Sequence, residues 1–189
     1  MRNSIYITEE SLPWLLEGSI AEQRKLIGRL SEDSCILLIS LVGNHYKSTL
    51  IPEEMSPLLR ESHLASKYHN LFIEVSRFLT SRNLYEMCKE QSDMDKQTLY
   101  VAALAQKVNE GDPDAFKYLC GIAEAPERQE ELRYCALTSL RMLPDKTHKK
   151  IRNTGKKTMR HILAQNHTSH QMREHARNLL YHWQEGRTG

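Results

Sequence analysis

Apolar side chains recur three and four residues apart through several segments of this 189-residue chain, and this spacing constrains its fold more than any other feature. It is the spacing of one face of an α-helix, whereas a half-buried strand alternates every second residue. The pattern predicts an all-α protein of about ten helices, arranged as stacked antiparallel pairs in a short solenoid or a compact bundle. Four stripes in the last third of the chain carry it: Ala115, Phe116, Leu119, Cys120 and Ala123; Leu132, Ala136, Leu140 and Leu143; Ile151, Met159, Ile162 and Leu163; and Met172, Ala176, Leu179, Leu180 and Trp183.

Capping residues mark where several of these helices begin. Ser19 followed by Glu22 has the spacing of a capping box, in which each side chain bonds the backbone N–H of the other residue. The segment Ser92-Asp93-Met94-Asp95 is expected to cap the helix that contains Leu99, Ala103 and Val108. Asp112 followed by Pro113 predicts a sharp helix start, because aspartate is a good N-cap and proline is tolerated at the first helical position.

Residues 35–42 form an apolar run that fits either a buried helix or a buried strand. The helix is favoured because no partner strand is visible elsewhere in the chain, and it is expected to end at Gly43-Asn44. The prolines at 52 and 57 indicate a short helix or an irregular connection. A further apolar helix face is expected after them, formed by Leu71, Val75, Phe78 and Leu79.

The sequence suggests an N-terminal helical region, 1–110, and a C-terminal region of paired helices, 111–186, joined in one continuous domain. The second region contains an internal repeat. Phe116, Leu119 and Cys120 match Met159, Ile162 and Leu163 at an offset of 43 residues; Leu132, Arg133, Ala136 and Leu140 match Met172, Arg173, Ala176 and Leu180 at an offset of 40. A two-helix unit of this length resembles the HEAT or armadillo repeat over residues 112–185. The resemblance implies helix pairs that stack to cover one another's apolar faces and that bind other proteins.

A second resemblance covers residues 140–183. A Leu143-Pro144 turn, Thr154-Gly155, a basic segment and a last helix ending in Trp183 are similar to the end of the helical-bundle domain at the N-terminus of transcription elongation factor TFIIS. Here the segment 164–170 is longer than in that family, and Thr154 stands where the family has isoleucine. This resemblance implies a module that docks short peptides of the transcription machinery.

Positive charge is concentrated in one part of the second region. Residues 1–100 hold 11 Lys+Arg and 14 Asp+Glu, whereas residues 101–189 hold 15 and 10. No acidic residue occurs between 146 and 173, and eight basic residues do. The candidate partner-binding residues are Lys149, Lys150, Arg152, Lys156, Lys157 and Arg160. They could dock an acidic segment or another subunit of a complex, or a nucleic-acid backbone, although a solvated helix face explains most charge runs. We expect a non-catalytic binding or scaffold module whose partner is another protein, with nucleic acid as the alternative.

Other chemistry is not indicated. The chain lacks the G-x-S-x-G, Walker A and G-x-G-x-x-G motifs, so neither a catalytic residue nor a cofactor is predicted. The four cysteines are scattered without C-x-x-C spacing, and three of them lie within apolar patterns. No histidine pair has the i, i+4 spacing of metal ligands, so no metal site is predicted. Trp14 and Trp183 are expected to cover the core at the terminal helices. The absence of a long apolar segment and of a signal-peptide core suggests a cytoplasmic or nuclear protein with no membrane partner.

Overall fold

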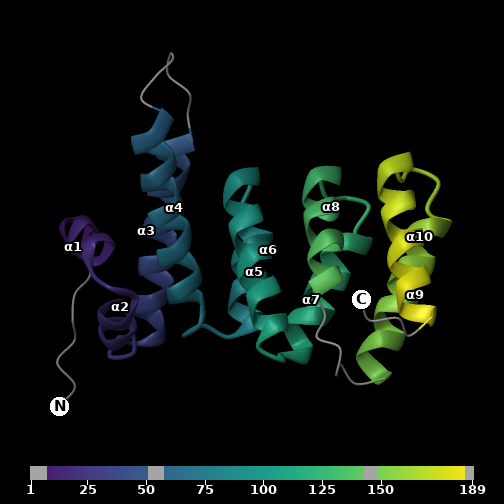
Figure 1. Cartoon of the computed structure of the whole chain (residues 1–189), viewed down its shortest axis with the longest axis horizontal. Helices are drawn as coiled ribbons and strands as arrows, with labels where there is room; N and C mark the ends of the chain where they lie inside the picture. The colour runs from purple at the N-terminus through teal and green to yellow at the C-terminus, as the bar shows by residue number, and fades with distance from the viewer. Residues whose placement is uncertain (1–7, 51–57, 143–148, 186–189) are drawn as a thin grey trace. The chain divides into compact units, whose positions relative to one another are not determined.

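The computed structural model describes residues 8–50, 58–142 and 149–185, and throughout these ranges the regular structure is helical, without a strand (Figure 1). The prediction of an all-α fold is therefore confirmed. Within these ranges, no helix is both long enough and apolar enough to span a bilayer. The chain divides into two compact units, Met1–Leu84 and Tyr85–Gly189, and each is described separately.

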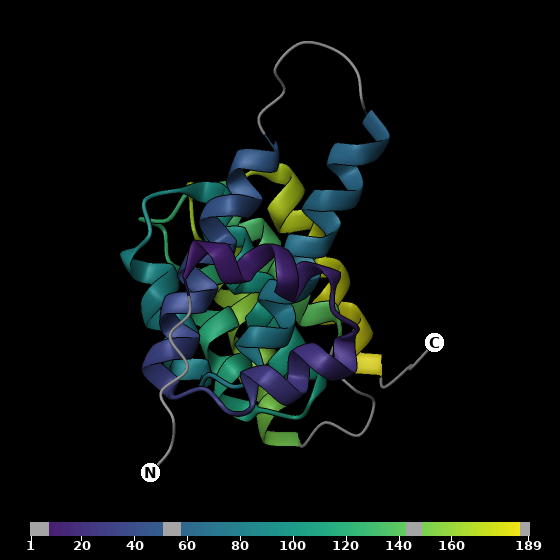
Figure 2. The ribbon, with the colours of Figure 1, turned by 90° about the vertical axis from the view of Figure 1, so that its left-hand side faces the viewer.

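The first unit is built on the antiparallel pair α3 (Glu32–Leu50) and α4 (Leu58–Ser76), which lie side by side in Figure 1. Their contact buries Leu38, Ile39 and Val42 of α3 together with Leu71 and Phe72 of α4. A one-turn 3-10 helix, η1 (Glu9–Ser11), leads into α1 (Leu12–Glu17), which is followed by α2 (Ile20–Ile27). Both α1 and α2 pack against α4, forming an outer layer of this unit (Figure 2).

The ambiguous residues 35–42 lie inside α3, so the preference for a helix is confirmed. The expected end at Gly43-Asn44 is wrong, because α3 continues to Leu50. Gly43 lies within the helix, where a Cβ would stand 3.5 Å from Cε2 of Phe72. The glycine therefore lies at the contact with α4, and tertiary packing outweighs its weak preference for helix.

The expected apolar face at 71–79 is correct only in part. Leu71, Val75 and Leu79 are buried, but α4 ends at Ser76 and Phe78 is 42% exposed. Phe78 lies in the turn after α4, with its ring against Gly28. The connection that contains the prolines at 52 and 57 lies outside the described residues.

An ion pair joins α2 to α4. The guanidinium of Arg24 donates to both carboxylate oxygens of Glu74, with Nε–Oε2 at 2.6 Å and Nη2–Oε1 at 3.0 Å. Glu74 is buried, and Nε of Arg77 lies 3.5 Å from its Oε1. The hydrogen bond from Arg24 holds the pKa of the Glu74 carboxyl below its ordinary value.

Helix α5 (Ser81–Glu90) spans the boundary between the units. The second unit continues with α6 (Met94–Asn109), α7 (Pro113–Glu124), α8 (Glu130–Ser139), a 3-10 turn η2 (Leu140–Met142), α9 (Lys149–Ala164) and α10 (His170–Glu185).

The expected caps are in place in both units. Ser19 N–H donates to Oε2 of Glu22 at 2.9 Å in the capping box of α2. The carboxylate of Asp93 accepts from the N–H of Lys96 at the start of α6. The carboxylate of Asp112 accepts from the N–H groups of Asp114 and Ala115 at the start of α7, where Pro113 occupies the first helical position.

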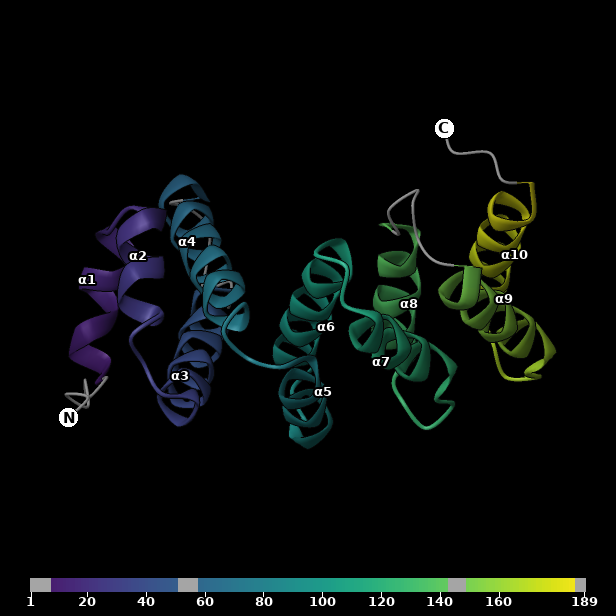
Figure 3. The same cartoon turned by 90° about the horizontal axis from the view of Figure 1, so that it is seen from below.

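In the second unit the helix pairs stack in register. Helix α7 pairs with α8 and α9 pairs with α10, and the first helices of the two pairs contact each other, as do the second helices (Figure 3). Helix α6 packs against both α7 and α8. This arrangement covers the apolar face of each pair with its neighbour, which is the stacked-pair architecture that the stripes predict.

Most stripe residues of the second unit are buried, including every member of the α7 stripe. Four predicted core residues, Ile151, Leu163, Leu180 and Trp183, are only half-buried. They belong to α9 and α10, the last pair of the stack, which among the described helices packs against one neighbouring pair. Leu143 lies outside the described residues.

Candidate binding face on helix α9

One side of helix α9 is buried, and these buried residues fix how the helix is oriented on the stack. Gly155, Thr158, Met159 and Ile162 are buried at intervals of three and four residues. This stripe packs against α7 and α10. The side chains on the opposite side of the helix must therefore face solvent.

Gly155 allows a close approach between α9 and α10. A Cβ at this position would lie 2.8 Å from Cη2 of Trp183 and 3.0 Å from Cζ of Phe116, so no larger residue fits without a shift. The Trp183 and Phe116 rings pack on each other with their centroids 6.5 Å apart. The expectation that Trp183 covers the core is confirmed, and this contact holds α9 between α7 and α10.

The solvent side of α9 carries the predicted cations. Lys157 and Arg160 are exposed and lie one helical turn apart, while Lys156 and Arg152 are half-buried along one edge. Arg152 also interacts with another group of the chain, so it is not wholly available to a partner. Lys149 and Lys150 lie in the first turn of α9, but their side chains are outside the described part of the chain. We refer to Arg152, Lys156, Lys157 and Arg160 as the α9 basic face.

No acidic residue occurs within α9, so no carboxylate of the helix itself neutralises its positive charge. His161 lies at the edge of α9 nearest α7, and its Nδ1 is 3.4 Å from Oε2 of Glu124 in α7. Like charges spaced three and four residues apart, such as Lys157 with Arg160 and Lys156 with Arg160, destabilise a helix by about 0.2–0.5 kcal/mol per pair. An acidic partner would relieve this repulsion.

A polar network that the sequence did not predict fixes the end of α9. Arg133 is 3% exposed; its Nε donates to the carbonyl of Ala123 at 3.1 Å, and its Nη2 donates to Oε1 of Gln165. Gln165 in turn donates to the carbonyl of Glu124 at 2.7 Å. Arg173 donates to the carbonyl of Gln165 at 2.9 Å. The C-terminal ends of α7 and α9 are therefore tied together, which sets the position of the basic face on the stack.

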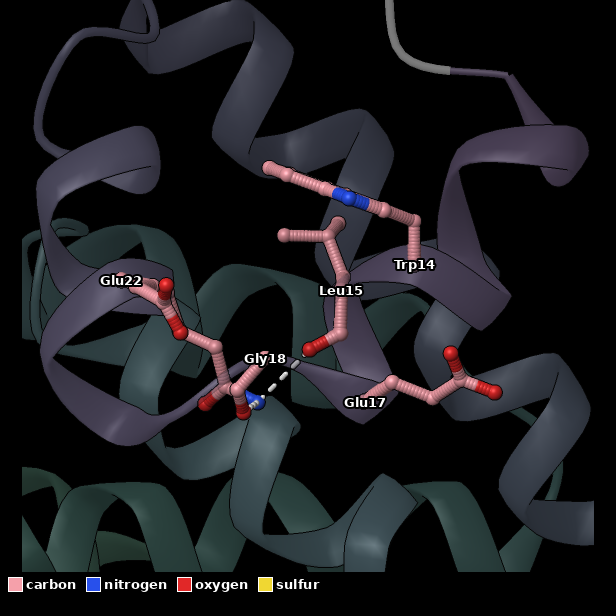
Figure 4. Close-up of a pocket in the computed structure, with 6 residues that line it drawn as sticks. Trp14, Leu15, Glu17, Gly18 and Glu22 are labelled. Carbon is pink, nitrogen blue, oxygen red and sulfur yellow. Dashed lines mark hydrogen bonds between the residues drawn. The ribbon is translucent and has the colours of Figure 1, made fainter.

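Trp14 contradicts the expectation that it covers the core. Its side chain is 63% exposed, while Leu12 and Leu15 of the same helix are buried. The two leucines are three residues apart and face inward, which leaves the indole pointing outward. A hollow of about 170 Å³ lies beside it, lined by Trp14, Leu15, Glu17, Gly18, Glu22 and Gln23 (Figure 4).

The described residues form no metal-binding cluster, and their buried cysteine thiols are not activated as nucleophiles. The residues described by the structure contain no group of three or more His, Cys, Asp or Glu side chains able to hold a metal ion. All four cysteines are free thiols, and burial raises the pKa of Cys88 to about 11 and that of Cys120 to about 12. Thiols with pKa values this high remain protonated and unreactive near neutral pH.

Comparison of the chain with models of known protein families, with curated proteins and with solved structures finds no match.

Proposed function

We propose that this protein is a non-catalytic binding module that docks an acidic segment of another protein onto the α9 basic face. The observation that carries the proposal is the distribution of charge on α9. Its solvent side presents Lys157 and Arg160, flanked by Lys156, and α9 itself contains no acidic residue. An acidic segment of a partner would remove the repulsion between these cations and be steered toward them.

Stacked helix pairs provide a rigid platform for such a surface. We propose that residues 112–185 act as HEAT-like repeats, in which α7 with α8 and α9 with α10 are the two units. The contacts of α7 with α9 and of α8 with α10 support this proposal, as do the equivalent bonds of Arg133 and Arg173.

A peptide-docking module like that of TFIIS is a second proposal for residues 140–183. The observation that favours it is the packing of Trp183 on Gly155, because these residues belong to the segments on which the resemblance rests.

A protein partner is favoured over a nucleic acid because α9 itself carries no Phe, Tyr or Trp. The rings of Phe116 and Trp183, which lie against Gly155 of α9, pack on each other. Single-stranded nucleic acids are generally held by exposed aromatic rings alternating with cations. The α9 basic face presents cations alone.

The experiment is co-purification of the full chain from its native cells, comparing the wild type with a Lys157→Glu, Arg160→Glu variant. A matched control is Arg29→Glu, Arg82→Glu, which makes the same change in charge at two exposed positions of the first unit. We expect a protein partner that is retained by the wild type and the control and lost from the α9 variant. Retention by all three proteins would contradict the proposal. Loss of the partner on nuclease treatment would favour the nucleic-acid alternative instead.

A further inference from the structure

The exposed tryptophan of the first unit stands beside a hollow of about 170 Å³. Pockets that hold cofactors or drug-sized molecules usually measure about 300–1,000 Å³. The hollow beside Trp14 is therefore large enough for one side chain of a partner and too small for a cofactor. Trp14, Leu15 and Gly18 are among the residues that line it.

A buried glutamine that lines the hollow bonds to the backbone of two other lining residues. Nε2 of Gln23 donates to the carbonyl of Leu15 at 2.8 Å and to that of Gly18 at 3.3 Å (Figure 4). These bonds connect α2 to the C-terminal end of α1. The Gln23 side chain and its two hydrogen bonds therefore help to set the shape of the hollow.

The charge around the hollow is negative. Glu17 and Glu22 are exposed and lie on opposite sides of Gly18 (Figure 4). Glu22 is oriented by hydrogen bonds from Ser19 N–H at 2.9 Å and from Ser19 Oγ at 2.7 Å. The C-terminal end of α1 lies beside the hollow, and α1 has no basic residue in its last turn. A helix C-terminus favours a positive charge.

We propose that this hollow binds a single lysine or arginine side chain projecting from a partner protein. The alkyl part of that side chain would lie on Leu15 and on the indole of Trp14, and its charge would lie between Glu17 and Glu22. Cations bind favourably over the face of tryptophan, and the carboxylates supply the complementary charge. This site lies in the first unit and does not depend on the α9 basic face.

The test is an NMR titration that observes the indole N–H groups of Trp14 and Trp183 in the full chain. The two signals are assigned with a Trp14→Phe variant. The probes are end-blocked glycine pentapeptides with arginine, leucine or glutamate at the centre, added at constant ionic strength. We expect the arginine peptide to shift the Trp14 signal saturably while the Trp183 signal does not move. An unmoved Trp14 signal, or an equal shift with the leucine peptide, would overturn the proposal.

Two variants test the roles of the carboxylates of Glu17 and Glu22 and of the indole of Trp14. Glu22→Gln removes the charge but keeps the capping box, since glutamine also serves at that position. We expect Glu17→Gln, Glu22→Gln to weaken binding of the arginine peptide. Trp14→Ala should weaken binding about two- to fivefold, the contribution of an exposed cation–π contact; because this variant lacks the Trp14 signal, its affinity is read from backbone amide shifts at Gly18 and Gln23.

Leu37→Ala is the control for both variants, because Leu37 is another exposed apolar residue of the same unit, 52% exposed. It should bind the arginine peptide as the wild type does. If Glu17→Gln, Glu22→Gln bound the arginine peptide with unchanged affinity, the role of the carboxylates would be contradicted. If Trp14→Ala did so, the role of the indole would be contradicted.

Discussion

Arg133 and Arg173 occupy equivalent positions in two consecutive helix pairs, and each guanidinium donates to backbone carbonyls at or directly after the C-terminal end of the first helix of its own pair. Arg133 bonds the carbonyl of Ala123 at 3.1 Å, and Arg173 bonds those of Gln165 at 2.9 Å and Asn166 at 3.1 Å. The last carbonyls of a helix have no partner within it, and a cation there also interacts favourably with the helix dipole. The sequence repeat at an offset of 40 residues therefore has a physical counterpart in the structure.

We expect Arg133→Met to lower the free energy of unfolding by about 1–3 kcal/mol, because it removes the donor to the carbonyl of Ala123 and one of the two donors to Oε1 of Gln165. Arg173 is half-buried, so Arg173→Met should have a smaller effect. Arg177→Met is the control, since Arg177 is exposed on the same helix. Urea unfolding followed by circular dichroism measures all three. Equal effects at 133 and 177 would show that the network does not stabilise the stack.

Two glycine-to-alanine substitutions should have opposite effects. In Gly155→Ala the new methyl group meets the Trp183 ring, and overpacking of this kind destabilises by about 1–3 kcal/mol. In Gly121→Ala nothing lies within 4 Å of the new methyl group. This second variant should be stabilised by up to about 1 kcal/mol, because alanine favours helix. Thermal melting distinguishes the two. Unchanged or raised stability of Gly155→Ala would contradict the close packing of α9 on α10, and a loss of stability in Gly121→Ala would contradict the open space beside that residue.

The thiols should differ in reactivity toward DTNB at mildly alkaline pH. Cys88 and Cys120 are buried, with pKa values raised to about 11 and about 12 by that burial. Cys135 is only half-buried and should react first. We expect Cys88 and Cys120 to react only after the protein is unfolded in urea. In the Cys135→Ser variant only Cys35, Cys88 and Cys120 remain. If the folded variant reacted quickly with two or more equivalents of reagent, Cys88 or Cys120 would be accessible, which would contradict their burial.

Acid should weaken the first unit through Glu74. Its folded pKa lies below the ordinary value of 4.5, chiefly because of the hydrogen bond from Arg24. The unfolded chain therefore takes up the proton first as the pH falls, and the stabilisation present above pH 4.5 is lost as the pH drops through the lowered folded value. We expect Glu74→Gln to reduce stability by about 1–3 kcal/mol at neutral pH and by less in acid. Glu86→Gln, at an exposed ion pair with Lys89, should have little effect at either pH. If the difference in unfolding free energy between the wild type and Glu74→Gln did not change with pH, the ion pair of Glu74 with Arg24 would be contradicted.

The sequence predicts the helices well because their signals are local. Asp93 and Asp112 cap their helices as expected, and the apolar spacing of the α7 stripe matches its buried face. The end of α3 is different, because Gly43 is retained in the helix at its contact with Phe72, and no local signal reports that contact.

The candidate sites depend on tertiary contacts to different extents. Charge clustering in the sequence is enough to locate α9, and its apolar stripe indicates which side is exposed. Only the structure shows that Arg152 is half-buried whereas Lys157 is exposed. The apolar character of Trp14 alone suggests burial, whereas Leu12 and Leu15 take up the inward side of α1. The three-residue spacing of these two leucines is the signal from which the outward direction of Trp14 could have been predicted.

Fluorescence anisotropy tests most directly whether the α9 basic face binds an acidic protein segment. The probes are a labelled oligoglutamate peptide and a labelled single-stranded DNA of equal charge, each titrated with the wild type, the Lys157→Glu, Arg160→Glu variant and the Arg29→Glu, Arg82→Glu control. We predict that the wild type and the control bind the peptide more tightly than the DNA at physiological salt, and that the α9 variant binds neither. Equal binding of the peptide by all three proteins, or tighter binding of DNA that weakens steeply with salt, would contradict the proposed function.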